Sequence, residues 1–449
     1  MKRRRYRAAE GAKIMVRDTC AALGLMCVMS AASASFVHAE TEAAENISSG
    51  TWASALETAE IFTERDLAQS ADTAEAVSLQ LQSGEDQTIT EEGVYILSGT
   101  AENATVIIDT PDDAKVQLVL DGIAVSNDDF PCIYVKNADK VFVTTTDSEN
   151  QLEVTGAFTA DGETNTDAAI FSRDDLVLGG AGTLTVSSTD NGISSKDDLK
   201  ITGGTLVISS AADALEANES IAMAGGTVAI TSSGDGLHAE NDEDSSTGWV
   251  YIAGGTLQIE AGDDAIHATT ILQIDGGSLS LSGAECLEAT WIQINDGEMD
   301  IHASDDAVNA AAKSDICLPT LEINGGGLTI AVGAGDTDAI DVNGNLYIRG
   351  GSIDITAQSP FDYDGQAEFS GGTLIVNGVE TTTLTNQMMG GGVPGMENAG
   401  SGNMQGGFMP GGHGGMGGHG GMGGFGGMNG YGNAEGYGNA EDFSGANSY

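Results

Sequence analysis

Hydrophobic and polar residues alternate along this chain in many short runs, and the runs recur at nearly regular intervals. The segment 203–208, Gly-Gly-Thr-Leu-Val-Ile, returns with small changes at 225–230 and at 254–259. Related copies begin at Ala181, Gly276, Asp296, Gly325, Gly350 and Gly371. Most steps between copies are about 20 to 25 residues, which is typical of a solenoid built from one repeated unit. Because alternation with a period of two places successive side chains on opposite faces, the runs predict β-strands.

Each repeat contains three such runs. One follows the glycine pair, a second is typified by 264–268 (Asp-Ala-Ile-His-Ala), and a third is an apolar triplet such as 250–252. No run can bury itself alone, so stacked coils of three short strands in about 22 residues predict an all-β parallel β-helix. We expect one wall of its core to be the inward column Ile193, Leu215, Leu237, Ile266, Leu287, Val308, Ile340 and Phe361.

Acidic residues form columns beside the second strand of the repeat. Alignment of the coils gives a first column of Asn191, Asp213, Asp235, Asp264, Glu285, Asp306, Asp338 and Ser359. An outward column follows it, with Ser194, Glu216, His238, His267, Glu288, Asn309, Asp341 and Asp362. Equivalent residues of stacked coils lie about 4.8 Å apart, so neighbouring carboxylates repel. Only 16 Lys and Arg face 67 Asp and Glu, a net charge of −51, so compensating charge must come from outside the chain.

Calcium suits such columns because it accepts several hard oxygen ligands and could bridge carboxylates of adjacent coils. The insertion 240–244, Glu-Asn-Asp-Glu-Asp, faces Asp263 and Asp264 of the next coil and is the best single candidate. The candidate metal residues are Asp213, Asp235, Asp242, Asp263, Asp264, Asp305, Asp306 and Asp338. The alternative is that these residues only cap turns. His238 and His267 could titrate or bind a metal, and solvated polar positions are the simpler interpretation.

Aromatic residues are rare, at 5% of the chain, and some share outward columns. Trp249 and Trp291 occupy equivalent positions two coils apart, and Tyr251 and Tyr347 share the neighbouring column. Flat rings on a β surface suit stacking against sugars, so these four residues are candidate carbohydrate-binding residues. The alternative is that they pack beneath the insertion or another loop.

The two ends of the chain depart from the repeat. Residues 1–39 combine a basic start, a short apolar run and small residues before Ala39, which predicts a secretory signal peptide. Residues 40–84 are expected to cap the open N-terminal end of a β-helix over 85–385, and the Gly/Met-rich residues 386–449 to form a flexible tail. After signal cleavage no integral membrane segment is expected. The acidic charge argues against nucleic acid as a partner.

Several blocks resemble a known family. They are the start at 62–67 (Phe-Thr-Glu-Arg-Asp-Leu), the units at 175–176 and 196–205, and the block at 235–244. Over roughly residues 60–385 the chain resembles the secreted bacterial carbohydrate-binding β-helix family, whose architecture is similar to that of pectate lyases. The resemblance implies a non-catalytic, calcium-containing, right-handed β-helix that binds plant cell-wall polysaccharide such as cellulose or polygalacturonate.

The resemblance also implies metal residues. By position these are Asp235, Asp242, Asp263 and Asp264, followed by Asp305 and Asp306. The sequence departs from the pattern at Glu285-Cys286, which argues against a metal in that coil.

Two other functions are compatible with the same fold. A calcium-dependent pectate-type lyase would need a Lys or Arg base, and Arg173 and Lys196 occupy equivalent sites in successive coils. Each is followed by two acids, which favours charge compensation instead. A surface adhesin or structural β-helix would need no small ligand at all.

Overall fold

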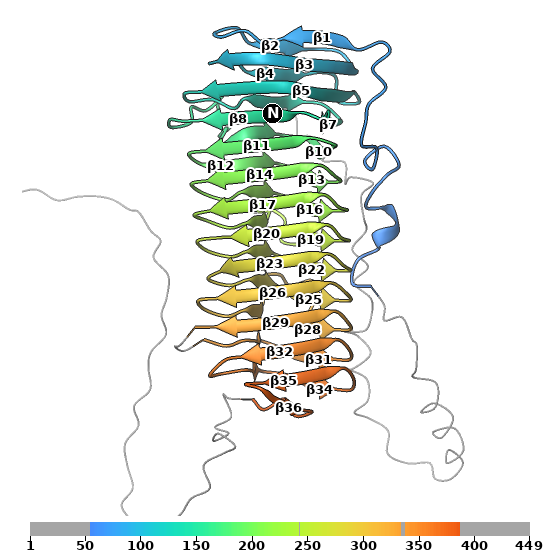
Figure 1. Ribbon diagram of the computed structural model, residues 1–449, viewed down its shortest axis with the longest axis vertical. Helices are drawn as coiled ribbons and strands as arrows, with labels where there is room; N and C mark the ends of the chain where they lie inside the picture. The colour runs from blue at the N-terminus through green and yellow to red at the C-terminus, as the bar shows by residue number, and fades with distance from the viewer. Residues whose placement is uncertain (1–53, 242, 334–336, 387–449) are drawn as a thin grey trace, which may run out of the picture. The chain divides into compact units, whose positions relative to one another are not determined.

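The computed structural model describes residues 54–241, 243–333 and 337–386, and these residues form a parallel β-helix of stacked coils (Figure 1). The predicted signal peptide, Asp242 and all but the first residue of the predicted tail lie outside the described residues. Within the described residues, no helix is long and apolar enough to cross a membrane.

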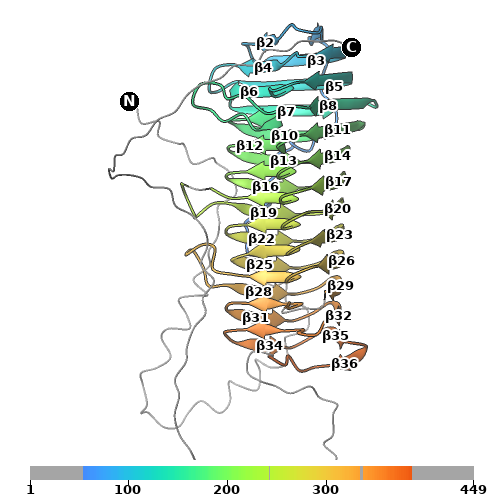
Figure 2. The ribbon, with the colours of Figure 1, turned by 90° about the vertical axis from the view of Figure 1, so that its left-hand side faces the viewer.

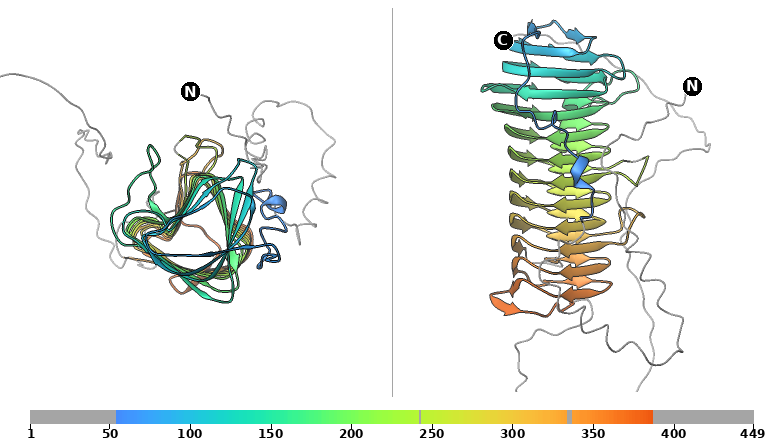
Figure 3. Two further views of the ribbon diagram at one scale, coloured as in Figure 1. Left: turned by 90° about the horizontal axis from the view of Figure 1, so that it is seen from above. Right: turned by 90° about the vertical axis from the view of Figure 1, so that its right-hand side faces the viewer.

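Each regular coil contributes one strand to each of three faces (Figures 2 and 3). The first face contains β1 (Val77–Gln80), β3 (Gly93–Glu102), β5 (Lys115–Asn127), β7 (Lys140–Thr145), β10 (Asp175–Gly180), β13 (Asp198–Ile201), β16 (Ser220–Met223), β19 (Trp249–Ile252), β22 (Ile271–Ile274), β25 (Trp291–Ile294), β28 (Thr320–Ile323), β31 (Asn345–Ile348) and β34 (Ala367–Phe369). The second face contains β8 (Glu149–Val154), β11 (Thr183–Ser188), β14 (Thr205–Ser210), β17 (Thr227–Ser232), β20 (Thr256–Glu260), β23 (Ser278–Gly283), β26 (Glu298–Ala303), β29 (Gly327–Val332), β32 (Ser352–Thr356), β35 (Thr373–Val376) and β36 (Val379–Thr381). The third face contains β2 (Gln87–Ile89), β4 (Val106–Asp109), β6 (Ile133–Asn137), β9 (Ala168–Ser172), β12 (Asn191–Ser195), β15 (Leu215–Ala217), β18 (Leu237–Ala239), β21 (Ile266–Ala268), β24 (Leu287–Ala289), β27 (Val308–Ala310), β30 (Asp341–Val342) and β33 (Asp362–Tyr363).

The register of the strands confirms the predicted columns. On the third face Leu215 pairs with Leu237, and Leu237 with Ile266, so the inward column is continuous from coil to coil. Each of its members from Ile193 to Phe361 is at most 1% exposed. The core is therefore a stack of mostly aliphatic side chains.

The corners between the first and second faces require glycine. Gly255, which precedes β20, has a φ of 102°, and a Cβ there would lie 2.9 Å from the carbonyl oxygen of Gly226 in the preceding coil. Since that conformation and that approach both exclude a side chain, the repeated glycine pair sets the position of the corner in every regular coil.

The two ends of the β-helix differ from its middle. β3 and β5 are long strands that continue around the corner, and their register shifts between Leu97 and Gly99. At the other end, β35 and β36 form the antiparallel pair that completes the second face. Such an irregular final strand leaves fewer backbone groups open to edge pairing.

Residues 54–76, which we call the strap, run along the side of the first face rather than over the end of the β-helix (Figures 1 and 3). The expected cap over 40–84 differs from this arrangement in two ways. Residues 54–76 lie beside the first face, and residues 77–80 already form β1 of the first coil. Within the strap, helical structure is limited to η1 (Thr58–Glu60), a short 3-10 helix. Side chains of the first face fix the position of the strap. The strap itself has no repeat pattern from which this position could be predicted.

The inward and outward positions of one strand should differ sharply in their contribution to stability. In β14, Ile208 is 2% exposed and its neighbour Val207 is 38% exposed. We expect Ile208→Ala to lower the free energy of unfolding by about 2–5 kcal/mol because it leaves a cavity. Val207→Ala should change it by less than about 0.5 kcal/mol. Urea unfolding followed by circular dichroism checks both values, and similar losses for the two variants would contradict the assigned register.

Candidate functional site: a carboxylate and histidine column on the third face

The acidic column borders the third face, where each coil turns into its short strand. The backbone N–H of Asp235 donates to Oδ1 of Asp213 (2.8 Å), and that of Asp264 donates to Oδ1 of Asp235 (2.8 Å). The N–H of Asp338 donates likewise to Oδ1 of Asp306 (2.7 Å). One oxygen of each of these carboxylates therefore accepts a hydrogen bond from the turn of the next coil and holds that coil in register. This is the turn-capping role that the sequence analysis gave as the alternative to metal binding.

The second oxygens of the central aspartates face two histidines. His238 of β18 and His267 of β21 pair in register, and their rings are stacked with centroids 4.8 Å apart and planes inclined by 10°. Nδ1 of His238 lies 2.6 Å from Oδ2 of Asp235, and Nδ1 of His267 lies 3.4 Å from Oδ2 of Asp264. His267 is only 8% exposed, so the expected solvated position is wrong for this residue.

The next coil adds a second carboxylate and a lysine. Oε2 of Glu288 lies 2.6 Å from Nδ1 of His267, and its Oε1 lies 2.6 Å from Nζ of Lys313. Burial favours neutral forms here, but the hydrogen bonds and charges of the carboxylates outweigh it and raise the pKa of His267. Burial likewise opposes ionisation of Glu288, and contact with His267 and Lys313 nevertheless lowers its pKa. The centre of the column is thus a network of opposite charges.

The structure brings together only part of the predicted metal set. Asp213 and Asp235 approach His238, and Asp235 and Asp264 approach His267, with the possible ligand atoms of each group within 4.8 Å of one another. Asp263 and Asp305 are exposed, and Asp242 lies outside the described residues. The groups that include His238 or His267 contain nitrogen as well as oxygen donors, which is a poorer match to calcium than the predicted all-oxygen set, whereas Asp264, Glu285 and Glu288 form an all-oxygen group.

The C-terminal coils hold carboxylates in a different setting. Burial and the charge of Asp305 and Asp338 raise the pKa of Asp306 to about 6. Burial and the charge of Asp306 and Asp362 raise the pKa of Asp341 to about 7. Because these shifts reflect desolvation and mutual repulsion, a divalent cation at this end of the column would relieve both.

A second carboxylate group was not predicted as a site. Asp175, Asp197 and Asp198 lie between the third and first faces in successive coils, and their ligand atoms are within 4.8 Å of one another. Burial and the charges of its two partners raise the pKa of Asp197 to about 8. The signal in the sequence is the repeated basic-Asp-Asp triplet at 173–175 and 196–198, whose acids also compensate the charge of Arg173 and Lys196.

The predicted aromatic platform is mostly covered. Trp249 and Tyr251 are each 6% exposed, Trp291 is half-buried, and all three pack in one cluster with residues of the strap. The columns themselves are as predicted, since Trp249, Ile271 and Trp291 stack in register. The expectation that these three rings are open to sugars is therefore wrong, because the strap occupies that face. Tyr347 lies outside the cluster and is half-buried, with the Arg349 guanidinium 4.6 Å above its ring.

Glutamine side chains and buried charges fix the strap. The backbone N–H groups of Ala55 and Leu56 donate to the side-chain oxygens of Gln293 and Gln273, at 2.8 Å each. Further along, the buried Asp66 lies 3.5 Å from Nζ of Lys200 and 3.7 Å from Nζ of Lys140. Nζ of Lys200 also donates to the carbonyl oxygen of Ile61 (2.6 Å).

These features define a parallel β-helix whose third face carries stacked carboxylates and imidazoles. The model of the family described as "Carbohydrate-binding domain-containing protein" matches residues 83–336. Because the match covers more than half of the chain, the chain belongs to this carbohydrate-binding domain-containing family, and the predicted resemblance is confirmed.

One curated protein and one solved structure are similar to parts of this chain. A "Carbohydrate-binding domain-containing protein" of Acetivibrio thermocellus is 37% identical over 122 residues, which are 26% of this chain and 42% of that protein. The chain therefore spans less than half of that relative's length. A solved structure, titled as a polysaccharide lyase-like protein from C. thermocellum in a gadolinium derivative, is 29% identical. It covers 50% of this chain and 93% of its own, with a TM-score of 0.44.

The charge on Asp66 should be required to hold the strap in place. In Asp66→Asn the buried Lys200 loses its carboxylate partner, a change that costs about 3–5 kcal/mol where both partners are buried, while Lys140 keeps its ion pair with Asp175. We expect the strap to detach, so that the tryptophan emission shifts to longer wavelength and residues 54–76 become sensitive to protease, while the β-helix stays folded. Glu75→Gln, at an exposed strap position, is the matched control. Unchanged emission and protease resistance in Asp66→Asn would show that the apolar contacts suffice.

Proposed function

We propose that this protein is a secreted, non-catalytic polysaccharide-binding protein that takes up calcium between carboxylates of adjacent coils. The observation that supports polysaccharide binding is membership of the carbohydrate-binding domain-containing family. We propose cell-wall polymers such as cellulose or polygalacturonate as the ligands. The predicted signal peptide supports export of the protein.

Ion pairing of the basic residues favours binding over cleavage. A lyase base must be able to lose its proton, yet Nζ of Lys196 lies 2.7 Å from Oε1 of Glu216. Although burial lowers it, the contact with Glu288 raises the pKa of Lys313. Arg349 lies 3.0 Å from Oε1 of Glu322. These partners stabilise the protonated forms, so none of the three residues is suited to abstract a proton from a sugar.

Of the four candidate aromatic residues, Tyr347 is the one we propose to contact sugar in the strap-covered state. It lies in the column of Tyr251, Gln273, Gln293 and Glu322, whose upper members hold the strap. The Arg349 guanidinium lies over the ring and pairs with Glu322 at 3.0 Å, so these two side chains would meet sugar hydroxyls as an ion pair. A ring flanked by polar side chains on an exposed β surface is a common arrangement for holding a polar ligand with an apolar face.

Calcium fits the carboxylate group of Asp175, Asp197 and Asp198 and the C-terminal carboxylates around Asp306 and Asp338. Both settings offer oxygen ligands, and the raised pKa values of Asp197 and Asp306 indicate that negative charge is disfavoured there, although Lys140 already pairs with Asp175. Bound calcium could also bridge to uronate carboxylates, which an acidic protein would otherwise repel.

Retention on insoluble polysaccharide tests the proposed function. We expect the full chain to sediment with cellulose or with calcium-crosslinked polygalacturonate, and Tyr347→Ala to weaken retention by about tenfold through loss of the ring contact. Trp249→Phe, which changes a ring beneath the strap, is the control and should be retained normally. No retention on any polymer, with calcium or with chelator, would favour the adhesin. Release of an unsaturated uronate absorbing in the ultraviolet would establish the lyase.

Calcium should raise the thermal stability of the unchanged protein more than that of Asp197→Asn, which lacks one carboxylate of the proposed site. In chelator and above pH 8, where Asp197 is ionised, Asp197→Asn should melt several degrees above the unchanged protein, because it removes a half-buried charge that its neighbours repel. Calcium at about 100 times its Kd should stabilise the unchanged protein by about 2.7 kcal/mol and the variant by less. Melting curves in EDTA, CaCl2 and MgCl2 check this, and indifference of both proteins to calcium would remove the metal from the proposal.

A further inference from the structure

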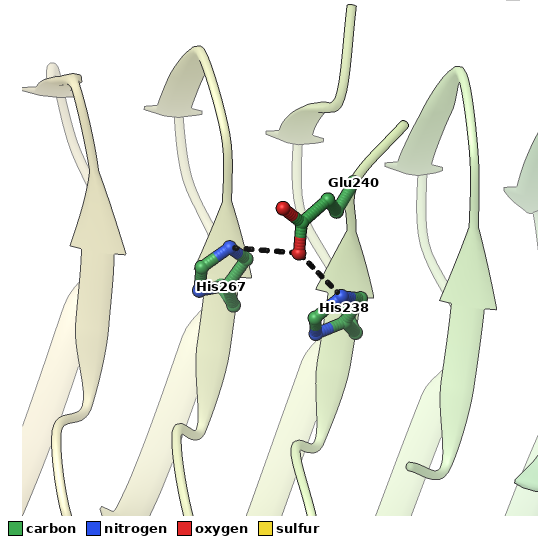
Figure 4. A group of neighbouring side chains, drawn as sticks. All are labelled: His238, Glu240 and His267. Atoms are coloured by element: carbon green, nitrogen blue, oxygen red, sulfur yellow. Dashed lines mark ion pairs between the residues drawn. The ribbon is translucent and has the colours of Figure 1, made fainter. Parts of the chain in front are cut away.

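Three side chains on the third face converge on one point without belonging to the all-oxygen groups proposed for calcium. They are His238 of β18, His267 of β21 and Glu240, which follows β18 (Figure 4). Oε2 of Glu240 lies 3.2 Å from Nε2 of His238 and 4.0 Å from Nε2 of His267. The candidate ligand atoms of the three residues all lie within 4.8 Å of one another.

The opposite side of each imidazole is held by a carboxylate. Nδ1 of His238 lies 2.6 Å from Oδ2 of Asp235, and Nδ1 of His267 lies 2.6 Å from Oε2 of Glu288. A hydrogen bond from Nδ1–H to a carboxylate fixes the tautomer and leaves the Nε2 lone pair as the ligand, and such carboxylate–histidine pairs are the usual second layer of protein zinc sites. Both Nε2 atoms here point toward the Glu240 carboxylate.

We propose that His238, His267 and Glu240 bind a divalent transition-metal ion, with Zn²⁺ as the best match. Two imidazole nitrogens and one carboxylate oxygen suit zinc and disfavour calcium, which prefers oxygen alone. Zinc has no d-electron preference for geometry, so it tolerates two rings presented by stacked strands. Three protein ligands leave a fourth position for water.

Only small movements separate the present arrangement from a tetrahedral site. Ligand atoms about 2.0–2.2 Å from a zinc ion lie about 3.3 Å from one another, so the pair of His238 and Glu240 already has the required separation. Glu240 must approach His267 by about 0.7 Å, and its side chain is 45% exposed and free of tight packing. The two rings must tilt toward each other from their nearly parallel stack.

A different role for the same histidines gives the opposite experimental result. As imidazolium ions they could neutralise Asp213, Asp235, Asp264 and Glu288 with no metal at all, and their contacts with these carboxylates would look the same. In that case, removal of both rings would change the charge of the column but not the number of zinc ions that the chain binds. Zinc binding separates the two possibilities.

The experiment uses the full chain, stripped with chelator and dialysed into buffer with calcium in excess, and titrated with Zn²⁺ by calorimetry. We expect the His238→Gln/His267→Gln protein to bind one zinc fewer than the unchanged chain, and Glu240→Gln to bind that ion at least tenfold more weakly. His302→Gln is the matched control, since this exposed histidine of β26 lies near Asp300 and belongs to no group of candidate metal ligands among the described residues. His413 and His419 are present in every protein compared, so any binding by the tail cancels in the difference.

Co²⁺ gives an independent readout of the same site. A tetrahedral or five-coordinate site should give visible absorption bands in the unchanged chain and in His302→Gln, and these bands should be lost from Glu240→Gln. Glu240 is partly exposed, so its variant keeps the test valid even where the double histidine variant does not fold. Equal zinc stoichiometry and affinity in all four proteins, or no zinc bound by the unchanged chain, would overturn the proposal. The zinc proposal does not depend on calcium uptake or on polysaccharide retention, so failure of either would not contradict it.

Discussion

Stacking in register is the constraint on which the rest of this molecule depends. Each coil places its side chains about 4.8 Å above the equivalent side chains of the coil before, so every position meets copies of itself. For an inward Leu or Ile this gives close apolar packing, as in the pairs Leu215–Leu237 and Leu237–Ile266. For an outward Asp it places like charges together, and each acidic column therefore needs a source of positive charge or hydrogen-bond donors.

The chain meets that need differently along its length. Lys140 and Lys200 compensate Asp66 and Asp175 near the N-terminal coils, and the strap is held by the same charges. In the middle, backbone N–H groups and two imidazoles face the aspartates. Toward the C-terminal end, the described residues offer Asp306 and Asp341 little besides other carboxylates, and there the pKa values are raised. Affinity for external cations should therefore vary from coil to coil even though the backbone repeats.

The repeat determined what the sequence could predict. The fold, the inward column and the pairing of His238 with His267 follow from the spacing of the coils, because one alignment places every equivalent residue. The strap could not be predicted in the same way, since it meets Gln273, Gln293 and Lys200 through contacts more than a hundred residues apart in sequence that no periodicity encodes. The return of Glu240 toward the two rings depends on a side-chain conformation in a single irregular turn. Its position in the sequence was visible, but its direction was not.

The same reasoning limits where a polymer can bind. The first face contains the aromatic column, but the strap covers its rings and hydrogen-bonds to the amide side chains beside them. The hydrogen-bonding groups of that part of the face are therefore already occupied by the strap. The second face presents small hydroxyl side chains such as Ser278 and Ser280, which offer hydrogen bonds but no ring for stacking. The third face presents charge. Apart from the Tyr347 ring that we propose beyond the strap, affinity for a polysaccharide must therefore come from many weak polar contacts along successive coils, from cation bridges, or from displacement of the strap. Each of these routes rewards a long polymer over a short oligosaccharide, because the contacts repeat with the coils while a short ligand spans few of them.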